Sequence, residues 1–142
     1  MSADIQRRLA RVEAELAVRT LIADYAIGLD AQQADRFMSV WSADAVWVNG
    51  GTEYRGAEAI RAELDRQWQN RSLVHHWTTN TTVEVDEDGR SARSISDVHV
   101  KAVATDGSVS EVGGRYRDDF VLEDRRWRMS RREVDVTFRH HR

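Results

Sequence analysis

The sequence predicts a single α+β domain in which helices come first and an antiparallel sheet follows. Two observations support this prediction. Apolar residues recur at helical spacing up to about residue 70, and from Ser72 onward the hydrophobic period becomes two, which is typical of strands. Short turn-like links separate the later segments, so consecutive strands must be antiparallel neighbours. Helices that precede such a meander pack against one face of its sheet.

The first expected element is a long helix from residue 3 to about residue 29. Its apolar residues form a stripe that shifts partway along the helix. The first set is Ile5, Leu9, Val12 and Leu16, and the second is Val18, Ile22, Tyr25 and Leu29. Residues 30–33, Asp-Ala-Gln-Gln, resemble a capping box. They predict that Asp30 caps a second, short helix that carries Phe37, Met38 and Trp41 inward.

A short hairpin over residues 45–49 and 50–54 and a third helix over about 57–70 are expected next. Four strands should follow, over residues 72–86, 91–104, 109–122 and 127–138. Strands this long must curl strongly to cover three helices, and Gly113-Gly114 is the expected bend or bulge. The predicted fold is therefore a cone-shaped barrel, a strongly curved antiparallel sheet closed by about three N-terminal helices. Its concave face is the place for a ligand pocket.

Composition excludes several classes of function. The net charge is -3 and arginines alternate with acidic residues, so no nucleic-acid partner is expected. The absence of cysteine excludes disulfides, thiol catalysis and thiolate metal sites. No apolar run approaches the roughly 20 residues of a membrane span, so a soluble cytoplasmic protein without a membrane partner is expected. Trp77, Val83 and Val85 should lie on the outer face of the first long strand, which predicts a homo-oligomer, a dimer or a trimer.

Asp30 and His76 are the main candidates for chemistry. A neutral imidazole is a usable base, and a carboxylate on its other nitrogen fixes the tautomer and stabilises the imidazolium. On the first long strand His76, Thr78 and Asn80 should share one face, while His75 takes the other. Two adjacent histidines that point apart do not bind one metal ion, and no metal site is expected. From the residues alone, Asp30 can equally be a helix cap and His76 a hydrogen-bonded core residue.

Six segments resemble the SnoaL-like branch of the nuclear transport factor 2-like superfamily. They are YAIGLD (25–30), VWSADA (40–45), YRG (54–56), HWTTN (76–80), GGRYRD (113–118) and WRMSRR (127–132). The resemblance covers nearly the whole chain. Within the branch, the order and spacing are most similar to hexachlorocyclohexane dehydrochlorinase, and more distantly to bile-acid 7α-dehydratase and scytalone dehydratase. The resemblance implies the same cone-shaped α+β barrel.

The resemblance also implies a cofactor-independent lyase that removes water or halide from a small, largely apolar, cyclic substrate by β-elimination. In such lyases a strand histidine takes a proton from carbon and an aspartate after the first helix orients it, and these positions hold His76 and Asp30. An arginine near the C-terminus assists the anionic leaving group, and its position holds Arg132. Tyr25 occupies a further active-site position. The other expected substrate contacts are Trp41, Trp47, Asn80 and Tyr116.

Alternatives remain open at this point. An isomerase or polyketide cyclase of the ketosteroid-isomerase type would use Asp30 as the base, and a non-catalytic binding or assembly module is a third reading because fold alone does not settle function. Tyr25 lies on the apolar stripe of the first helix and can serve packing alone. Arg132 can be a solvent-facing strand residue, since a bulge would exchange it with Arg131. The other histidines are expected at the surface: His75, His99, His140 and His141.

Overall fold

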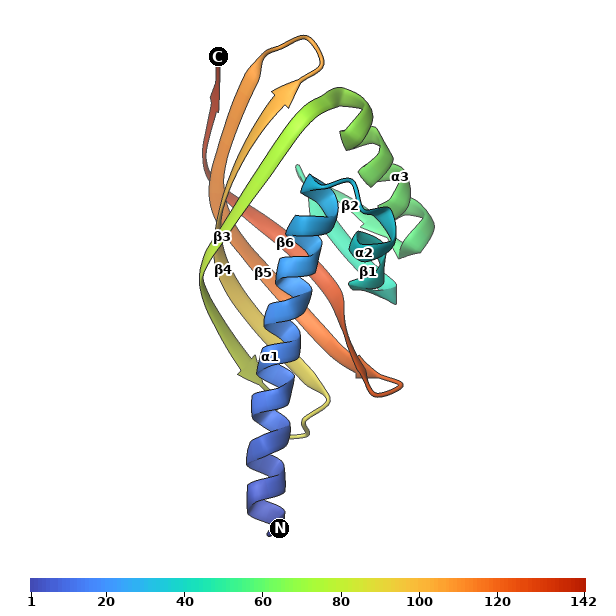
Figure 1. Ribbon diagram of the computed structural model, residues 1–142, viewed down its shortest axis with the longest axis vertical. Coiled ribbons are helices and arrows are strands. Elements are labelled where there is room, and N and C mark those ends of the chain that lie inside the picture. Colours follow the sequence, from blue (N-terminus) through green and yellow to red (C-terminus); the bar gives the residue numbers. More distant parts are fainter.

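The structure is a computed structural model that describes residues 1–142 and contains three helices and six strands (Figure 1). The helices are α1 (Ala3–Asp30), α2 (Ala34–Ser39) and α3 (Gly56–Asn70). The strands are β1 (Trp41–Asn49), β2 (Thr52–Arg55), β3 (Arg71–Val85), β4 (Ser91–Ala104), β5 (Val109–Glu123) and β6 (Arg126–His141). The order of elements and the α+β class are those that the sequence predicts.

All strands belong to one six-stranded sheet with the order β2-β1-β6-β5-β4-β3. The β3 to β6 meander and the β1–β2 hairpin are both antiparallel, as predicted. β1 also pairs with β6 in parallel, which sets Trp47 opposite Arg132 and was not predicted. Parallel neighbours need a long crossover connection, so local periodicity cannot reveal such a pair. This pairing joins the β1–β2 hairpin to the edge of the β3 to β6 meander.

The sheet curves strongly but does not close on itself, because β2 and β3 remain its two edges. Figure 1 shows α1 along the concave side of the sheet, and α1 packs on β3 while α3 packs on β1. The helices therefore complete the cone. The predicted bulge at Gly113-Gly114 is confirmed by a shift of the β5–β6 register. A Cβ atom on Gly114 would collide with the carbonyl oxygen of Asp135, so the close approach of the strands requires glycine there.

The two apolar sets along α1 have different environments. The second set, from Val18 to Leu29, is buried in the main core. The first set, from Ile5 to Leu16, is exposed. The N-terminal end of α1 extends past the strand ends (Figure 1), and Leu16 faces away from the core, because Ala14 and Val18 on either side of it are buried. No helix in the protein combines the length and the apolar character needed to cross a lipid bilayer.

The predicted helix cap at Asp30 is wrong. Asp30 is the last residue of α1, and α2 begins at Ala34 after Gln33, whose side chain makes no capping hydrogen bond. The carboxylate of Asp30 is not available for capping, because both of its oxygens accept hydrogen bonds from His76. Trp41 is buried as expected but belongs to β1 rather than to α2.

A bulge in β3 changes which side chains face outward. The β3–β4 register shifts between Thr79 and Thr82, and Asn80 has a φ of 53°. Beyond the bulge the alternation is reversed, so Val83 and Val85 pack against the core instead of lying on the outer face. Trp77, before the bulge, is 46% exposed. The expected outer apolar surface therefore loses two of its three residues, and the homo-oligomer stays a prediction.

The C-terminal segment is exposed, as expected, but it is not a free tail. β6 extends to His141 and pairs with β5 through Ser110 and Glu111. His75, His140 and His141 lie at the surface. The side chain of His99 is also partly exposed, at 44%, and its ring stacks on Trp77 with 5.5 Å between the ring centroids.

The contact between α1 and α2 gives a testable prediction about Gly28. A Cβ atom there would lie 2.6 Å from the backbone nitrogen of Phe37. Overpacking costs about 1–3 kcal/mol, more than the roughly 1 kcal/mol that alanine gains in helix propensity. We expect Gly28→Ala to lower the free energy of unfolding measured in urea. The exposed change Arg11→Ala on the same helix should stay within about 0.5 kcal/mol of the parent. Stabilisation by Gly28→Ala would contradict the close helix contact.

Candidate active site

The C-terminal end of α1 and the strand β3 bring Asp30 and His76 together across 46 residues of sequence. The Nδ1 atom of His76 lies 2.6 Å from Oδ1 of Asp30, and the backbone nitrogen of His76 donates to Oδ2 at 2.8 Å. The indole nitrogen of Trp68 on α3 donates to the carbonyl oxygen of Leu29 at 2.9 Å. The end of α1 is thereby held by both α3 and β3, and the carboxylate has a fixed place.

This geometry defines the protonation pattern of the pair. The His76 side chain is 5% exposed and the Asp30 side chain is 15% exposed. Because the carboxylate accepts from Nδ1–H, the neutral imidazole keeps its lone pair on Nε2. No protein group hydrogen-bonds Nε2, which is the nitrogen available to a ligand. The ring of Tyr25 meets that of His76 at 88° with 6.0 Å between centroids and holds its plane.

His76 lines a cavity of about 80 Å³ on the concave side of the sheet. Pockets for drug-sized ligands measure about 300–1,000 Å³, so this cavity suits a much smaller molecule. Its apolar wall is formed by Trp47, Val98, Val100, Val112, Val134 and Val136 together with the rings of Tyr25 and Tyr116. Its polar lining is formed by Asn49, Gln67, Arg71, His76 and Arg139, with Gly50 at the β1–β2 turn.

Behind the two tyrosines lies Arg132, which is 1% exposed. Its guanidinium carbon is 4.2 Å from the ring centroid of Tyr25 and 3.7 Å from that of Tyr116. Nε and Nη2 donate to the two carboxylate oxygens of Asp118 at 2.8 and 2.7 Å, and Ser94 also donates to this carboxylate. Nη1 is buried without a partner. The arginine is therefore a fixed positive charge held between two aromatic rings.

The electrostatics keep both tyrosine hydroxyls protonated. Burial raises the pKa of Tyr25 well above its ordinary value, and the neighbouring Tyr116 adds to this effect. Burial also raises the pKa of Tyr116. The positive charge of Arg132 opposes both shifts without reversing them. Both hydroxyls are thus neutral. The two side chains hydrogen-bond to each other, so one hydroxyl keeps its proton free for a ligand.

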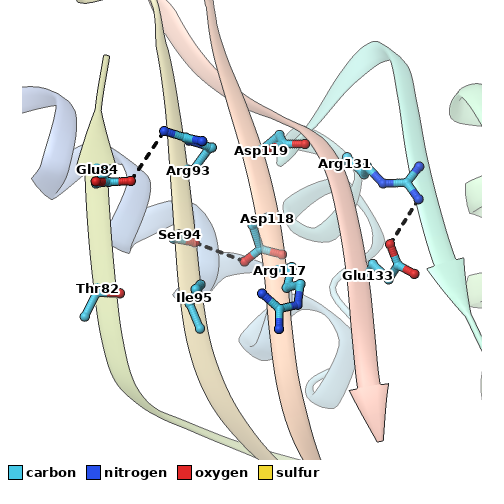
Figure 2. A pocket seen from close by; sticks show the side chains of 10 residues that line it. All are labelled: Thr82, Glu84, Arg93, Ser94, Ile95, Arg117, Asp118, Asp119, Arg131 and Glu133. Atoms are coloured by element: carbon cyan, nitrogen blue, oxygen red, sulfur yellow. Dashed lines mark hydrogen bonds and ion pairs between the residues drawn. The ribbon is translucent and has the colours of Figure 1, made fainter. Parts of the chain in front are cut away.

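A larger hollow of about 420 Å³ lies on the opposite face of the sheet (Figure 2). Of its ten lining residues only Ile95 is hydrophobic. It is lined by both arginines and acidic residues, and several of these form ion pairs with each other, as Arg93 does with Glu84 and Arg131 with Glu133. It contains no histidine and no apolar wall, so the smaller cavity at His76 is the candidate active site.

Comparison with known proteins assigns the family. A family profile described as "SnoaL-like domain" matches residues 10–133. The chain belongs to the SnoaL-like family. This SnoaL-like protein is 28% identical over 127 residues to hexachlorocyclohexane dehydrochlorinase 1 of Sphingobium indicum, a match that covers 87% of this chain and 81% of the relative.

Two solved structures resemble the fold. The hexachlorocyclohexane dehydrochlorinase LinA-type3 from Novosphingobium barchaimii superposes with a TM-score of 0.87 at 23% identity, covering 94% of this chain and 93% of the other. A protein from Novosphingobium aromaticivorans, provisionally named a scytalone dehydratase, gives a TM-score of 0.84 at 19% identity, covering 92% and 89%. At these identities the likeness shows that the fold is shared.

The structure brings most of the expected site residues of this SnoaL-like protein together. Four of them line the cavity: Tyr25, Trp47, His76 and Tyr116. Asp30 contacts His76, and Arg132 contacts the rings of Tyr25 and Tyr116. Two expected residues are elsewhere. Trp41 packs in the core between Phe37 and Trp47 and does not line the cavity. Asn80 is exposed and donates to Asp97 at 2.8 Å, because the bulge in β3 turns it away from the face of His76.

Sequence reasoning missed the polar rim of the cavity. Arg71 lies five residues before His76, and strict alternation would put it on the outer face. A register shift between Arg71 and Leu73 turns it inward. Arg139 was expected in a solvated tail, yet the extended β6 places it at the cavity. Only the inward position of Gln67 could have been predicted, because Gln67 lies three positions after Leu64 and therefore on the same face of the predicted third helix.

The buried ion pair gives a prediction about stability. Removal of one partner from a buried ion pair costs about 3–5 kcal/mol, because the other charge stays buried and uncompensated. We expect Asp118→Ala to lower the free energy of unfolding by about that amount. The neighbouring pair of Arg117 with Asp135 is as short, at 2.7 Å, but exposed. Asp135→Ala should therefore change stability by less than about 1 kcal/mol. Equal losses in chemical denaturation would contradict the assignment.

The protonated state of Tyr25 gives a prediction about pH. A tyrosine titrates near pH 10 when unfolded, while the folded protein holds the proton to a higher pH. The contribution of the Tyr25 hydroxyl to the free energy of unfolding is therefore complete below pH 10. It falls as the pH rises above 10, because ionisation then stabilises only the unfolded state. Relative to the parent, Tyr25→Phe should be less destabilised at pH 11 than at pH 9. An unchanged difference between the two urea denaturation series would show that the hydroxyl titrates normally.

Proposed function

We propose that this SnoaL-like protein is a cofactor-independent lyase that removes water or a halide from a small, largely apolar, cyclic molecule by β-elimination. One observation carries the proposal. The 2.6 Å contact between Nδ1 of His76 and Asp30 leaves Nε2 as a basic atom at an apolar cavity. The similarity to a hexachlorocyclohexane dehydrochlorinase supports the same class of reaction.

In this reaction Nε2 of His76 takes a proton from a ring carbon. The electron pair of the broken C–H bond forms a double bond to the adjacent carbon, and the leaving group departs from that carbon with its bonding pair. The carboxylate of Asp30 stabilises the imidazolium that forms, and its fixed position keeps the ring aligned. The imidazolium then releases its proton to solvent.

Departure of the leaving group requires a second contribution. Tyr25 and Tyr116 hydrogen-bond to each other, so one hydroxyl is free to donate at the cavity, and Arg132 lies against both rings. A halide would accept a hydrogen bond from this hydroxyl. A departing hydroxide would take up a proton from solvent, to which the imidazolium returns one, and leave as water. Arg132 therefore assists the leaving group through the tyrosines, and Nη1 is its one nitrogen without a partner in the protein.

The alternative base is disfavoured by the contacts of Asp30. In chemistry of the ketosteroid-isomerase type, the carboxylate itself would meet the substrate. Here both oxygens of Asp30 accept from His76, and Asp30 does not line the cavity. A purely structural module would fill its interior with side chains, so the open cavity beside a histidine also favours a ligand site.

The test is a screen of cyclic alcohols and chlorinated rings for loss of water or chloride, followed by substitution of the dyad. His76→Ala should lower kcat by about 10²–10⁴-fold. Asp30→Asn should lower kcat as well, because a neutral amide cannot balance the imidazolium. The control is His140→Ala, an exposed histidine on β6 that does not line the cavity, and this variant should behave as the parent.

Each outcome assigns the base. Full activity of His76→Ala would refute the dyad mechanism. Loss of activity in Asp30→Asn with retention in His76→Ala would instead support the isomerase-type base.

A further inference from the structure

Arg71 lines the cavity without an acidic partner. It is half-buried at the start of β3, and Nη1 donates to Oε1 of Gln67 at 2.9 Å. This is its only hydrogen bond within the protein, and no carboxylate lies within ion-pair distance. A guanidinium has five N–H donors and stays charged at every ordinary pH, so most of its binding capacity remains unused.

A polar network on α3 explains why the partner of Arg71 is neutral. The buried carboxylate of Glu63 accepts from Arg66 at 2.7 and 2.8 Å and from Nε2 of Gln67 at 3.0 Å. Because Nε2 of Gln67 is committed to Glu63, Oε1 is the atom that faces Arg71. Glu63 is thus already balanced by Arg66. Gln67 orients Arg71 without neutralising it.

A second cation shares the cavity. Arg139 on β6 lines the same space as Arg71 and also has no ion pair. Burial lowers the pKa of Arg71, and the positive charges of Arg66 and Arg139 also lower it, although Tyr25 and the more distant carboxylate of Glu63 act in the opposite direction. Two like charges that face one partly buried space repel each other unless an anion lies between them. The same cavity is also lined by five valines, which form an apolar wall: Val98, Val100, Val112, Val134 and Val136.

We propose that the substrate of this site is a small carboxylate whose anionic group binds Arg71 and Arg139 while its apolar body lies against the valine wall beside His76. The inference rests on the proposed function in taking the His76 cavity as the substrate site. A carboxylate matches the planar fork of a guanidinium, and such charge-assisted pairs are stronger than neutral hydrogen bonds. The anchor lies away from the reacting carbon and orients the ring toward Nε2.

Matched pairs of single-ring probes test the charge requirement. Benzoate and cyclohexanecarboxylate are compared with benzamide and cyclohexanecarboxamide by isothermal titration calorimetry on the full chain. Each acid should bind at least about tenfold more tightly than its amide. Arg71→Gln should reduce this preference to about twofold or less, and Arg139→Gln should reduce it in part. Arg139 is exposed at the rim, so its variant reports on binding without risk to the fold.

The control variant is Arg117→Gln, which removes an exposed arginine from the charged hollow on the other face. It should keep the full preference for the acid. Equal binding of acid and amide, no binding of any probe, or an unchanged preference in Arg71→Gln would overturn the inference. Loss of the preference in Arg117→Gln would also overturn it, by placing the anion site on the outer face. Tighter binding of sodium chloride than of benzoate would assign the arginines to a leaving halide instead.

The same experiments separate this inference from the proposed function. If the acid preference depends on Arg71 while turnover does not depend on His76, the anionic ligand stands and the lyase mechanism fails. If turnover requires His76 while acids and amides bind alike, the mechanism stands and the anionic substrate fails.

Discussion

The side-chain alternation of the long strands is interrupted by bulges, and most features of the site depend on where these interruptions fall. The register shift after Arg71 turns that arginine into the cavity. The shift after Thr79 turns Asn80 out and Val83 in. One of the two shifts in the β5–β6 ladder falls at the glycine pair, Gly113-Gly114. Each bulge both curves the sheet and reassigns the faces of a strand, so curvature and pocket chemistry have a common origin.

The buried polar groups of the site form two pairs, and each pair leaves one atom without a partner. Asp30 is satisfied twice by His76, which leaves one basic nitrogen, and Arg132 is satisfied by Asp118, which leaves one unpaired donor. A half-satisfied buried charge is costly, and such arrangements persist where the free atom has a use. In this domain the free atoms lie at or directly behind a single apolar cavity. That coincidence supports the proposal that this cavity is an active site.

The sequence predicted the fold and the dyad better than it predicted the rest of the pocket. Helical and strand periods predicted the order of the elements. The structure brings Asp30 into contact with His76, while Arg132 contacts Tyr25 and Tyr116. The cap at Asp30 failed because a capping box is a local pattern, whereas a strand 46 residues away binds this carboxylate. The predicted faces of Arg71 and Asn80 were wrong, because a bulge reverses the alternation of side chains along a strand and leaves no trace in the composition.

The sequence by itself determined the class of the domain and the order of its elements. These features follow from local spacing, which the chain carries in one dimension. The tertiary structure decided the parallel pairing of β1 with β6, the faces that Arg71, Arg139 and Asn80 occupy, and the place of Arg132 behind two tyrosines. These features depend on strand register and sheet curvature, which arise only when distant segments pack against one another.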